Sequence, residues 1–232
     1  CLLSRGLGDV YKRQEYFIEG GRSRSGRLLP PKKGMLAMTV QSHLRQAGKP
    51  IVFIPTYIGY ERIMEGGTYV GELKGKPKES ESLLGLLKAS RKIERIFGHV
   101  HVSFGQPLYL ADFMKKFDVA PNTLPKDRTD SDMPANVIHM IDNLGIKIMQ
   151  RINRSAVLNP VTLLALVLLD TPHGALDEQS CREQLALYQR IAEKIPYDDD
   201  VSITQQSPEA IINYGVKLKL IQRTPHAVSY TH

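Results

Sequence analysis

The sequence has 232 residues, of which 42% are hydrophobic and 24% charged, which is typical of a soluble globular chain with one large or two modest domains. Its formal net charge of +7 favours acidic partners, namely phosphorylated metabolites, nucleic acid or an anionic membrane surface. Cys1 and Cys181 are far apart and have no CxxC spacing, so the sequence indicates neither a disulfide framework nor a zinc site. No apolar run reaches the roughly 20 residues that cross a bilayer.

Both ends differ in texture from the rest of the chain. Residues 1–14 and 228–232 resemble translated adaptor sequence, so we expect a non-native leader and a non-native tail. Residues 1–14 also lack the order of a secretory signal. Because no initiator methionine is present, we expect the natural protein to start upstream.

An anion-binding loop is predicted near the start of the remaining chain. Residues 15–18 predict a short strand, and residues 19–27 are rich in glycine, serine and arginine. Glycines let backbone N–H groups turn toward a ligand and approach it closely. The guanidinium groups of Arg22 and Arg24 match phosphate oxygens.

A second candidate segment follows the next two predicted elements. Residues 32–47 predict a helix, and the apolar run 51–55 predicts a strand buried on both faces. Residues 56–61 then place two phenols and a carboxylate beyond a strand end, where open α/β sheets bind ligands. Tyr57 and Tyr60 are equally compatible with tyrosines that cap the core.

The middle of the chain predicts surface features. Residues 66–78 predict a loop, and a helix from Ser80 or Ser82 to about Phe97 has a basic face that is either solvated or placed on anionic headgroups. Residues 99–105 alternate as a strand does, with His99 and His101 on one face. No carboxylate or cysteine has metal-site spacing with them, so polar strand-face histidines are favoured over metal ligands.

The C-terminal part predicts mainly helices. Residues 112–132 predict a loop or linker, followed by helices over residues 134–155, 160–169, 176–195 and 208–221. The fold class is therefore α/β: a partial α/β layer over residues 15–130 and an α-helical region over residues 131–227.

Two segments carry a resemblance to a known family. Residues 17–26 resemble the third acyltransferase block of glycerol-3-phosphate acyltransferases, and residues 50–61 resemble the fourth. The similarity is closest to the bacterial membrane-bound branch, extends to residues 159–166 and 174–177, and covers Glu15 to about Arg223. It implies that the α/β layer is part of a glycerolipid-acyltransferase fold.

The resemblance also implies an activity. It is transfer of a fatty acyl group from acyl-carrier protein or acyl-CoA to the sn-1 hydroxyl of glycerol 3-phosphate, in phospholipid biosynthesis. The acyl donor is a substrate, and no other cofactor and no metal is implied. The implied location is the cytoplasmic face of the bacterial inner membrane, peripheral or embedded, on an anionic surface. The implied substrate-binding residues are Glu19, Gly20, Gly21, Arg22, Ser23, Arg24, Gly26, Pro55, Tyr57, Tyr60 and Glu61.

The family's earlier blocks have no counterpart in this sequence. A histidine in a His-x-x-x-x-Asp block acts as the family's general base on the hydroxyl, and the nearest pattern, from His173 to Asp177, has one residue too few. We therefore assign no catalytic residue and expect a fragment that is inactive alone. Glu19 either orients an arginine or accepts a glycerol hydroxyl.

Two alternatives remain beside the leading hypothesis. One is an acyltransferase with another acceptor, such as a lysophospholipid or dihydroxyacetone phosphate. The other is a non-enzymatic anion- or nucleic-acid-binding module built on residues 22–27. The sequence has no RNA-recognition aromatic signature and no helix-turn-helix spacing, so nucleic acid is not among the expected partners.

Overall fold

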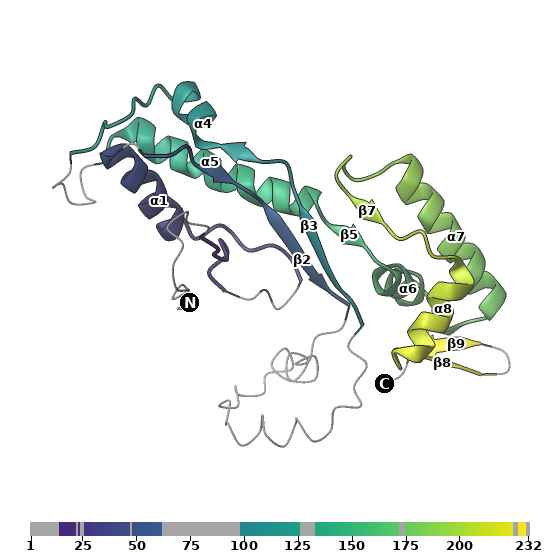
Figure 1. Ribbon diagram of the computed structural model, residues 1–232. Helices are drawn as coiled ribbons and strands as arrows, with labels where there is room; N and C mark the ends of the chain where they lie inside the picture. The colour runs from purple at the N-terminus through teal and green to yellow at the C-terminus, as the bar shows by residue number, and fades with distance from the viewer. Residues whose placement is uncertain are drawn as a thin grey trace, which may run out of the picture. The chain divides into compact units, whose positions relative to one another are not determined.

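The structure is a computed structural model that describes residues 14–21, 23, 26–46, 48–61, 98–125, 133–171, 175–224 and 227–230 (Figure 1). These residues form six helices and nine strands, so the protein is a mixed α and β structure. It divides into two compact units, one from residues 1–55 and 104–153 and the other from residues 56–103 and 154–232. The ranges 15–130 and 131–227 stay a prediction.

The first unit is built on two helices, α1 (Gly34–Arg45) and α5 (Ala135–Arg154), which lie side by side in Figure 1. Apolar residues recur every three or four positions on both helices, so each helix turns one stripe toward a shared core. The buried residues of these stripes are Leu36, Val40, Leu44, Val137, Met140, Ile141, Leu144 and Ile148. The expected helices 32–47 and 134–155 are confirmed within a few residues at their ends.

The strands of the first unit are shorter than expected. β1 (Val52–Phe53) pairs antiparallel with β4 (Leu108–Tyr109) in a two-stranded sheet. Val52 is 40% exposed, so the prediction of a strand over residues 51–55 buried on both faces is wrong. The strand expected at residues 15–18 is also absent, because this part is irregular and then turns.

A short helix lies where a loop was predicted. α4 (Leu110–Lys116) occupies the start of the 112–132 segment. Leu110, Phe113 and Met114 are buried in the core, so packing of one apolar face stabilises a helix despite the polar, proline-containing sequence that follows. The loop expected at residues 66–78 and the helix expected up to Phe97 lie outside the described residues.

The second unit contains three helices with their own core. They are α6 (Pro160–Leu169), α7 (Glu178–Lys194) and α8 (Pro208–Lys217). Each begins at a side-chain cap: Asn159, Asp177 and Ser207 accept hydrogen bonds from backbone N–H groups three residues further on. The buried core residues are Leu163, Leu164, Val167, Leu168, Cys181, Leu185, Ile211, Ile212, Ile221 and Val228.

Three small sheets contain the remaining strands. β2 (Thr56–Tyr60) pairs with β3 (Val100–Phe104), and β5 (Val157–Leu158) runs parallel to β7 (Ser202–Ile203). The strand expected over residues 99–105 is thus confirmed. A third sheet has the order β6 (Ala175–Leu176), β9 (Val228–Tyr230), β8 (Ile221–Arg223). Its central strand belongs to the segment expected to be a tail, and Val228 is fully buried.

These strands also shift two predicted helix ends. The helix expected from residue 176 begins at Glu178, because Ala175 and Leu176 pair with β9 and Asp177 caps the helix. The helix expected to reach residue 221 ends at Lys217, because Lys219 has a positive φ of 56° and Ile221 starts β8. In the part of the chain that the structure describes, no helix is both long and apolar enough to cross a membrane.

Two helical glycines are predicted to respond oppositely to alanine. A Cβ at Gly145 of α5 would be 3.5 Å from Leu36 Cδ2, an ordinary contact, so G145A is expected to raise the free energy of unfolding by about 0.5–1 kcal/mol. A Cβ at Gly215 of α8 would overlap Leu164 Cδ2 and lie 3.0 Å from Ile221 Cδ1, so G215A is expected to lower it by about 1–3 kcal/mol. Urea unfolding of both variants tests this prediction. A change in the free energy of unfolding in the same direction for G145A and G215A would contradict the packing described.

Candidate functional site

Two hydrogen bonds join the ends of residues 18–32, the segment that contains the predicted anion-binding loop of residues 19–27. Lys32 N donates to the carbonyl oxygen of Ile18 over 2.7 Å, and Leu29 N donates to Glu19 Oε2 over 2.8 Å. Ile18 is buried in the core of the first unit, which anchors the loop. Glu19 therefore helps to hold the two ends of this segment together, and the two roles expected for it from the sequence stay predictions.

A tight turn places the glycines of the loop. Gly20 N donates to the carbonyl oxygen of Phe17 over 3.0 Å, and Gly20 has a φ of +60°. A Cβ at Gly20 would lie 2.8 Å from Lys32 Cγ, so both the conformation and the space require glycine. Gly21 has open space around it, and Gly26 has open space but a φ of +74°.

Alanine substitutions in this loop should therefore follow a fixed order. G20A is expected to lower the free energy of unfolding by about 1–3 kcal/mol, because it adds steric overlap to a left-handed conformation. G26A adds only the conformational cost, of about 1 kcal/mol. G21A is the matched control and should change stability by less than about 0.5 kcal/mol. Urea unfolding that ranks G21A as the most damaging variant would exclude this loop geometry.

One hydroxyl of the loop is buried without a partner. Among the described residues, Ser23 Oγ is enclosed and makes no hydrogen bond. Such a group is costly unless water or a ligand completes its hydrogen bonding. Arg22 and Arg24, which are expected to bind phosphate, are the sequence neighbours of Ser23 and lie outside the described residues, as does Ser25.

The remaining predicted site residues lie around β2. Pro55 is buried, and its carbonyl oxygen accepts a hydrogen bond from Gly105 N over 2.8 Å. Tyr57 is partly buried, with its ring packed against the backbone of Gly59. Tyr60 is 59% exposed. Pro55 belongs to the first unit with the loop, whereas both tyrosines and Glu61 belong to the second.

Glu61 is the centre of a hydrogen-bonded cluster in the second unit. Its side chain is only 1% exposed. Oε2 accepts from His99 N over 2.7 Å and from the Tyr214 hydroxyl over 2.5 Å, and Oε1 lies 3.0 Å from His101 Nε2. The Tyr214 hydroxyl also lies 2.7 Å from His99 Nδ1, and the two rings stack with centroids 5.5 Å apart. One carboxylate thus joins β2, β3 and α8.

The charge state of this cluster follows from its hydrogen bonds. Burial raises the pKa of the Glu61 carboxyl, but hydrogen bonds from Tyr214, His99 and His101 lower it by more, so the net pKa is below its usual value. Burial raises the pKa of Tyr214, and so does its hydrogen bond to Glu61. The group at neutral pH is a carboxylate held by a neutral phenol, an arrangement suited to holding strands and helix together.

Sequence reasoning assigned only part of this cluster. Glu61 was a candidate ligand contact and the two histidines were polar strand-face residues, whereas nothing singled out Tyr214. The alternation of His99 and His101 on one strand face was the available signal. Among the residues that the structure describes, no group of three or more histidine, cysteine, aspartate or glutamate side chains could hold a metal ion.

Sequence comparisons place the chain among known proteins. Residues 69–231 match the family described as glycerol-3-phosphate acyltransferase C-terminal region. The chain belongs to this family. The resemblance carried by residues 17–26 and 50–61 is thereby confirmed at the level of the family.

Curated relatives of this C-terminal region are named glycerol-3-phosphate acyltransferase. One from Xanthomonas campestris is 43% identical over 213 residues, which are 91% of this chain and 24% of the relative. One from Pseudomonas fluorescens is 40% identical over 214 residues, which are 92% of this chain and 25% of the relative. One from Xylella fastidiosa is 41% identical over 213 residues, which are 91% of this chain and 24% of the relative. The chain thus spans about a quarter of the length of these relatives, and the roles assigned to single residues stay predictions.

Proposed function

We propose that the chain supplies the acceptor-binding part of an enzyme that transfers a fatty acyl group from acyl-carrier protein or acyl-CoA to the sn-1 hydroxyl of glycerol 3-phosphate. The observation that carries this proposal is the segment of residues 18–32, whose ends are joined by hydrogen bonds and in which the buried hydroxyl of Ser23 has no hydrogen-bond partner. Arg22 and Arg24 flank Ser23 in the sequence. The names of the curated relatives support the acceptor. The described elements then form part of a glycerolipid-acyltransferase α/β layer.

Each residue of the loop has a role in this proposal. Arg22 and Arg24 bind the phosphate through charge-assisted hydrogen bonds, and the Ser23 hydroxyl donates to a phosphate oxygen. Glu19 keeps the loop closed by accepting a hydrogen bond from Leu29 N. Gly20 and Gly21 allow the backbone to turn at the ligand.

The reaction itself is an acyl transfer from a thioester. The acceptor hydroxyl oxygen forms a bond to the thioester carbonyl carbon, the carbon–sulfur bond breaks, and the hydroxyl proton leaves with the thiol. No residue of this chain is assigned as the general base. The histidines beside Glu61 are held by its carboxylate and by Tyr214, which suits a structural function.

The proposed setting is phospholipid biosynthesis at the cytoplasmic face of the bacterial inner membrane. A net charge of +7 supports contact with an anionic membrane surface. Acyl-carrier protein or acyl-CoA arrives from solution as the donor substrate, and no other cofactor is required.

A chimera tests this proposal. Residues 15–231, which include β9, replace the matching part of the Xanthomonas campestris relative, and transfer of a labelled acyl group to glycerol 3-phosphate is measured. We expect the chimera to form 1-acylglycerol 3-phosphate and the 232-residue chain alone to form none. Activity of the chain alone would refute the expected absence of the base. A folded chimera that prefers a lysophospholipid or dihydroxyacetone phosphate would refute the proposed acceptor.

Ser23 gives a prediction that separates binding from stability. S23A removes a buried hydroxyl that lacks a partner, so the free energy of unfolding of the chain is expected to stay the same or to rise slightly. In the chimera, the same change is expected to raise the KM for glycerol 3-phosphate about tenfold, the effect of one hydrogen bond to a charged group. Urea unfolding and steady-state kinetics check the two halves. Loss of stability with unchanged KM would show that the hydroxyl is structural.

A further inference from the structure

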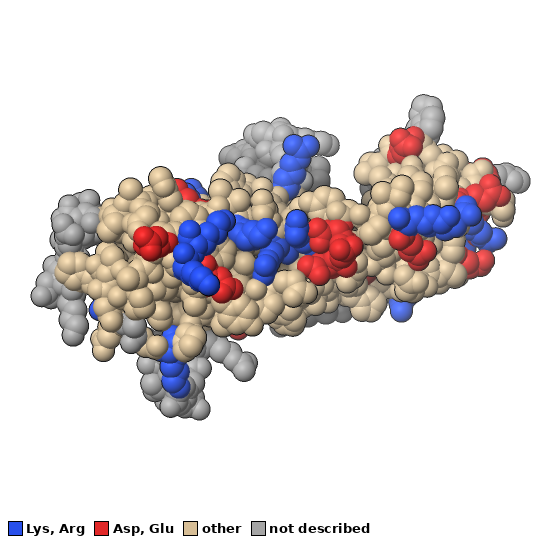
Figure 2. All heavy atoms as spheres, turned by 90° about the horizontal axis from the view of Figure 1, so that it is seen from above, with Lys and Arg blue, Asp and Glu red and all other residues tan. Residues whose placement is uncertain are grey.

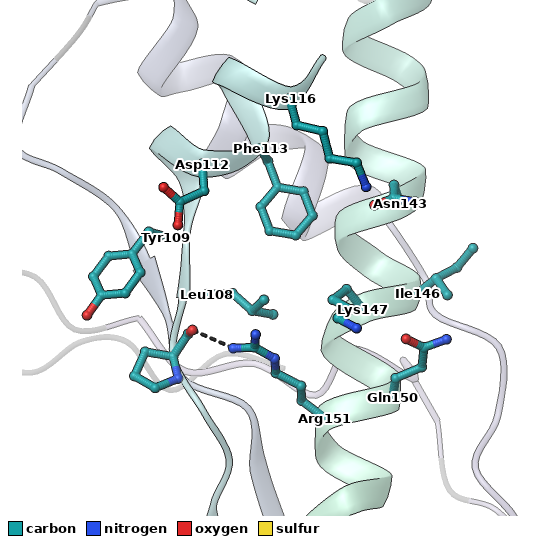
Figure 3. Close-up of a pocket in the computed structure, with 11 residues that line it drawn as sticks. Leu108, Tyr109, Asp112, Phe113, Lys116, Asn143, Ile146, Lys147, Gln150 and Arg151 are labelled. Carbon is teal, nitrogen blue, oxygen red and sulfur yellow. Dashed lines mark hydrogen bonds between the residues drawn. The ribbon is translucent and has the colours of Figure 1, made fainter.

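A cavity of about 390 Å³ lies between α4 and α5 of the first unit, apart from every residue assigned to acyl transfer (Figure 3). Its apolar part includes Leu108 and Phe113, which are 4% and 9% exposed. Tyr109 and Ile146, each 51% exposed, also line it. The cavity therefore combines a buried apolar wall with an apolar margin that is open to the outside.

Basic side chains and one amide line the cavity from both helices. Asn143, Lys147 and Arg151 of α5 are spaced four residues apart, so they project from one face of the helix. Lys116 of α4 extends toward Asn143 in Figure 3. Figure 2 shows that this face of the molecule carries basic side chains interspersed with acidic ones.

The geometry fixes one of these cations in place. Arg151 Nη1 donates to the backbone carbonyl oxygens of Gln106 and Pro107 over 2.6 and 2.5 Å. Lys116 Nζ lies 5.3 Å from the centre of the Phe117 ring. Among the described residues, Lys116 and Lys147 form no ion pair.

The charge balance of the cavity selects an anion. Lys116, Lys147 and Arg151 face a single carboxylate, Asp112, which points toward Tyr109 in Figure 3. The ammonium groups of two lysines from different helices can donate hydrogen bonds to the oxygens of one phosphate. The amide of Asn143 adds a neutral hydrogen-bonding group. The exposed Tyr109 and Ile146 suit an apolar group attached to that phosphate.

We propose that this cavity binds the phosphate of an anionic lipid, with the lipid chains directed along Tyr109 and Ile146. A soluble phosphate would use the lysines but gain nothing from the exposed apolar margin. The site lies outside the acceptor loop, so its existence is independent of the acyl-transfer reaction proposed above.

The first test uses soluble probes and the 232-residue chain. Hexyl phosphate is expected to bind at least about tenfold more tightly than inorganic phosphate in calorimetric titrations. K116Q and K147Q are each expected to weaken hexyl phosphate binding about fivefold, which corresponds to about 1 kcal/mol per basic residue at an anionic surface. K115Q is the matched control, because Lys115 neighbours Lys116 on α4, is exposed and does not line the cavity. Equal binding of the two phosphates, or equal loss in K115Q, would overturn the proposal.

The second test separates a lipid from a soluble phosphate ester. Binding to vesicles of three parts phosphatidylcholine and one part phosphatidylglycerol is measured by co-sedimentation. The affinity of K147Q and of I146S for these vesicles is expected to be about fivefold lower than that of the unaltered chain. I138S is the control, since Ile138 is 41% exposed on the same helix but does not line the cavity. Vesicle binding that is unchanged in K147Q and I146S would overturn the assignment to a lipid, even if hexyl phosphate binding changed. Circular dichroism confirms that the variants are folded.

Discussion

Replacing Glu61 by glutamine is expected to lower the free energy of unfolding of the second unit by about 3 kcal/mol. The carboxylate is buried and lies within hydrogen-bonding distance of three groups from β3 and α8. Hydrogen bonds to a charged group contribute about 1.5–3 kcal/mol each, and leaving buried partners unsatisfied adds to the loss. Glutamine keeps the shape but offers one acceptor oxygen and turns an NH2 group toward donors. Urea unfolding followed by far-UV circular dichroism measures the change.

Two variants bracket this expectation. Y214F removes one of the three donors and is expected to cost about 1–2 kcal/mol. E193Q is the matched control, because Glu193 is exposed on α7 and its contact among the described residues is a long one, 3.4 Å from Gln205 Nε2, so its effect should stay below about 0.5 kcal/mol. A loss in E61Q as small as that in E193Q would contradict the role of this carboxylate in joining the strands to the helix.

The contribution of Glu61 should also depend on pH. Its pKa is lower in the folded than in the unfolded protein, where an ordinary glutamate titrates near about 4.3. Its stabilising effect is therefore fully present above that value and is lost as the pH falls through the lower folded pKa. The difference in unfolding free energy between the unaltered chain and E61Q should shrink as the pH falls below about 4. If this difference in unfolding free energy instead grew on acidification, the pKa of Glu61 would be raised and not lowered by folding.

The helices were the most predictable part of the fold. α1, α5, α6 and α8 have apolar residues at helical spacing, and α6 and α8 also begin at a cap followed by proline. α4 was missed because it has only seven residues and the prolines and charged residues that follow it favoured a loop, although Leu110, Phe113 and Met114 have helical spacing. Burial of three side chains in the core stabilises it instead, and such tertiary packing leaves little signal in a short sequence.

The strands show why apolar composition alone is insufficient. Residues 51–55 have the β-branched composition of a strand inside a parallel sheet, but only Val52 and Phe53 pair, and they have one partner strand. Which partners a strand finds depends on segments far away in the chain. The Glu61 cluster could not be predicted for the same reason, because Tyr214 is 153 residues away from Glu61 in the sequence.

The candidate loop was predictable in its composition but not in its construction. Clustered glycines and arginines indicated an anion site, and the positive φ of Gly20 and Gly26 agrees with the predicted need for glycine. The hydrogen bond from Leu29 to Glu19 and the burial of Ser23 Oγ depend on how residues ten positions apart meet. They add support of the loop to the roles expected for Glu19, which were to orient an arginine or to accept a glycerol hydroxyl.

The second large effect is expected from the two arginines of this loop. Replacing Arg22 and Arg24 together by alanine in the chimera should lower kcat/KM for glycerol 3-phosphate by at least about 100-fold. Each charge-assisted hydrogen bond to a phosphate is worth about 1.5–3 kcal/mol, and about 1.4 kcal/mol corresponds to a factor of ten. The phosphate is bound in the ground state and in the transition state alike, so most of the loss should appear in KM.

Two controls accompany this double variant. R27A removes an arginine of the same loop that is not assigned to the phosphate, and it should change KM less than about threefold. The KM for the acyl donor should be the same in the double variant as in the chimera, because the arginines are assigned to the acceptor alone.

The most direct measurement is the KM for glycerol 3-phosphate, at saturating acyl donor, of the chimera and of its R22A/R24A variant. The proposed acceptor site predicts a rise in this KM of two orders of magnitude or more, with the donor KM unchanged. An unchanged KM for glycerol 3-phosphate in a folded, active double variant would contradict it.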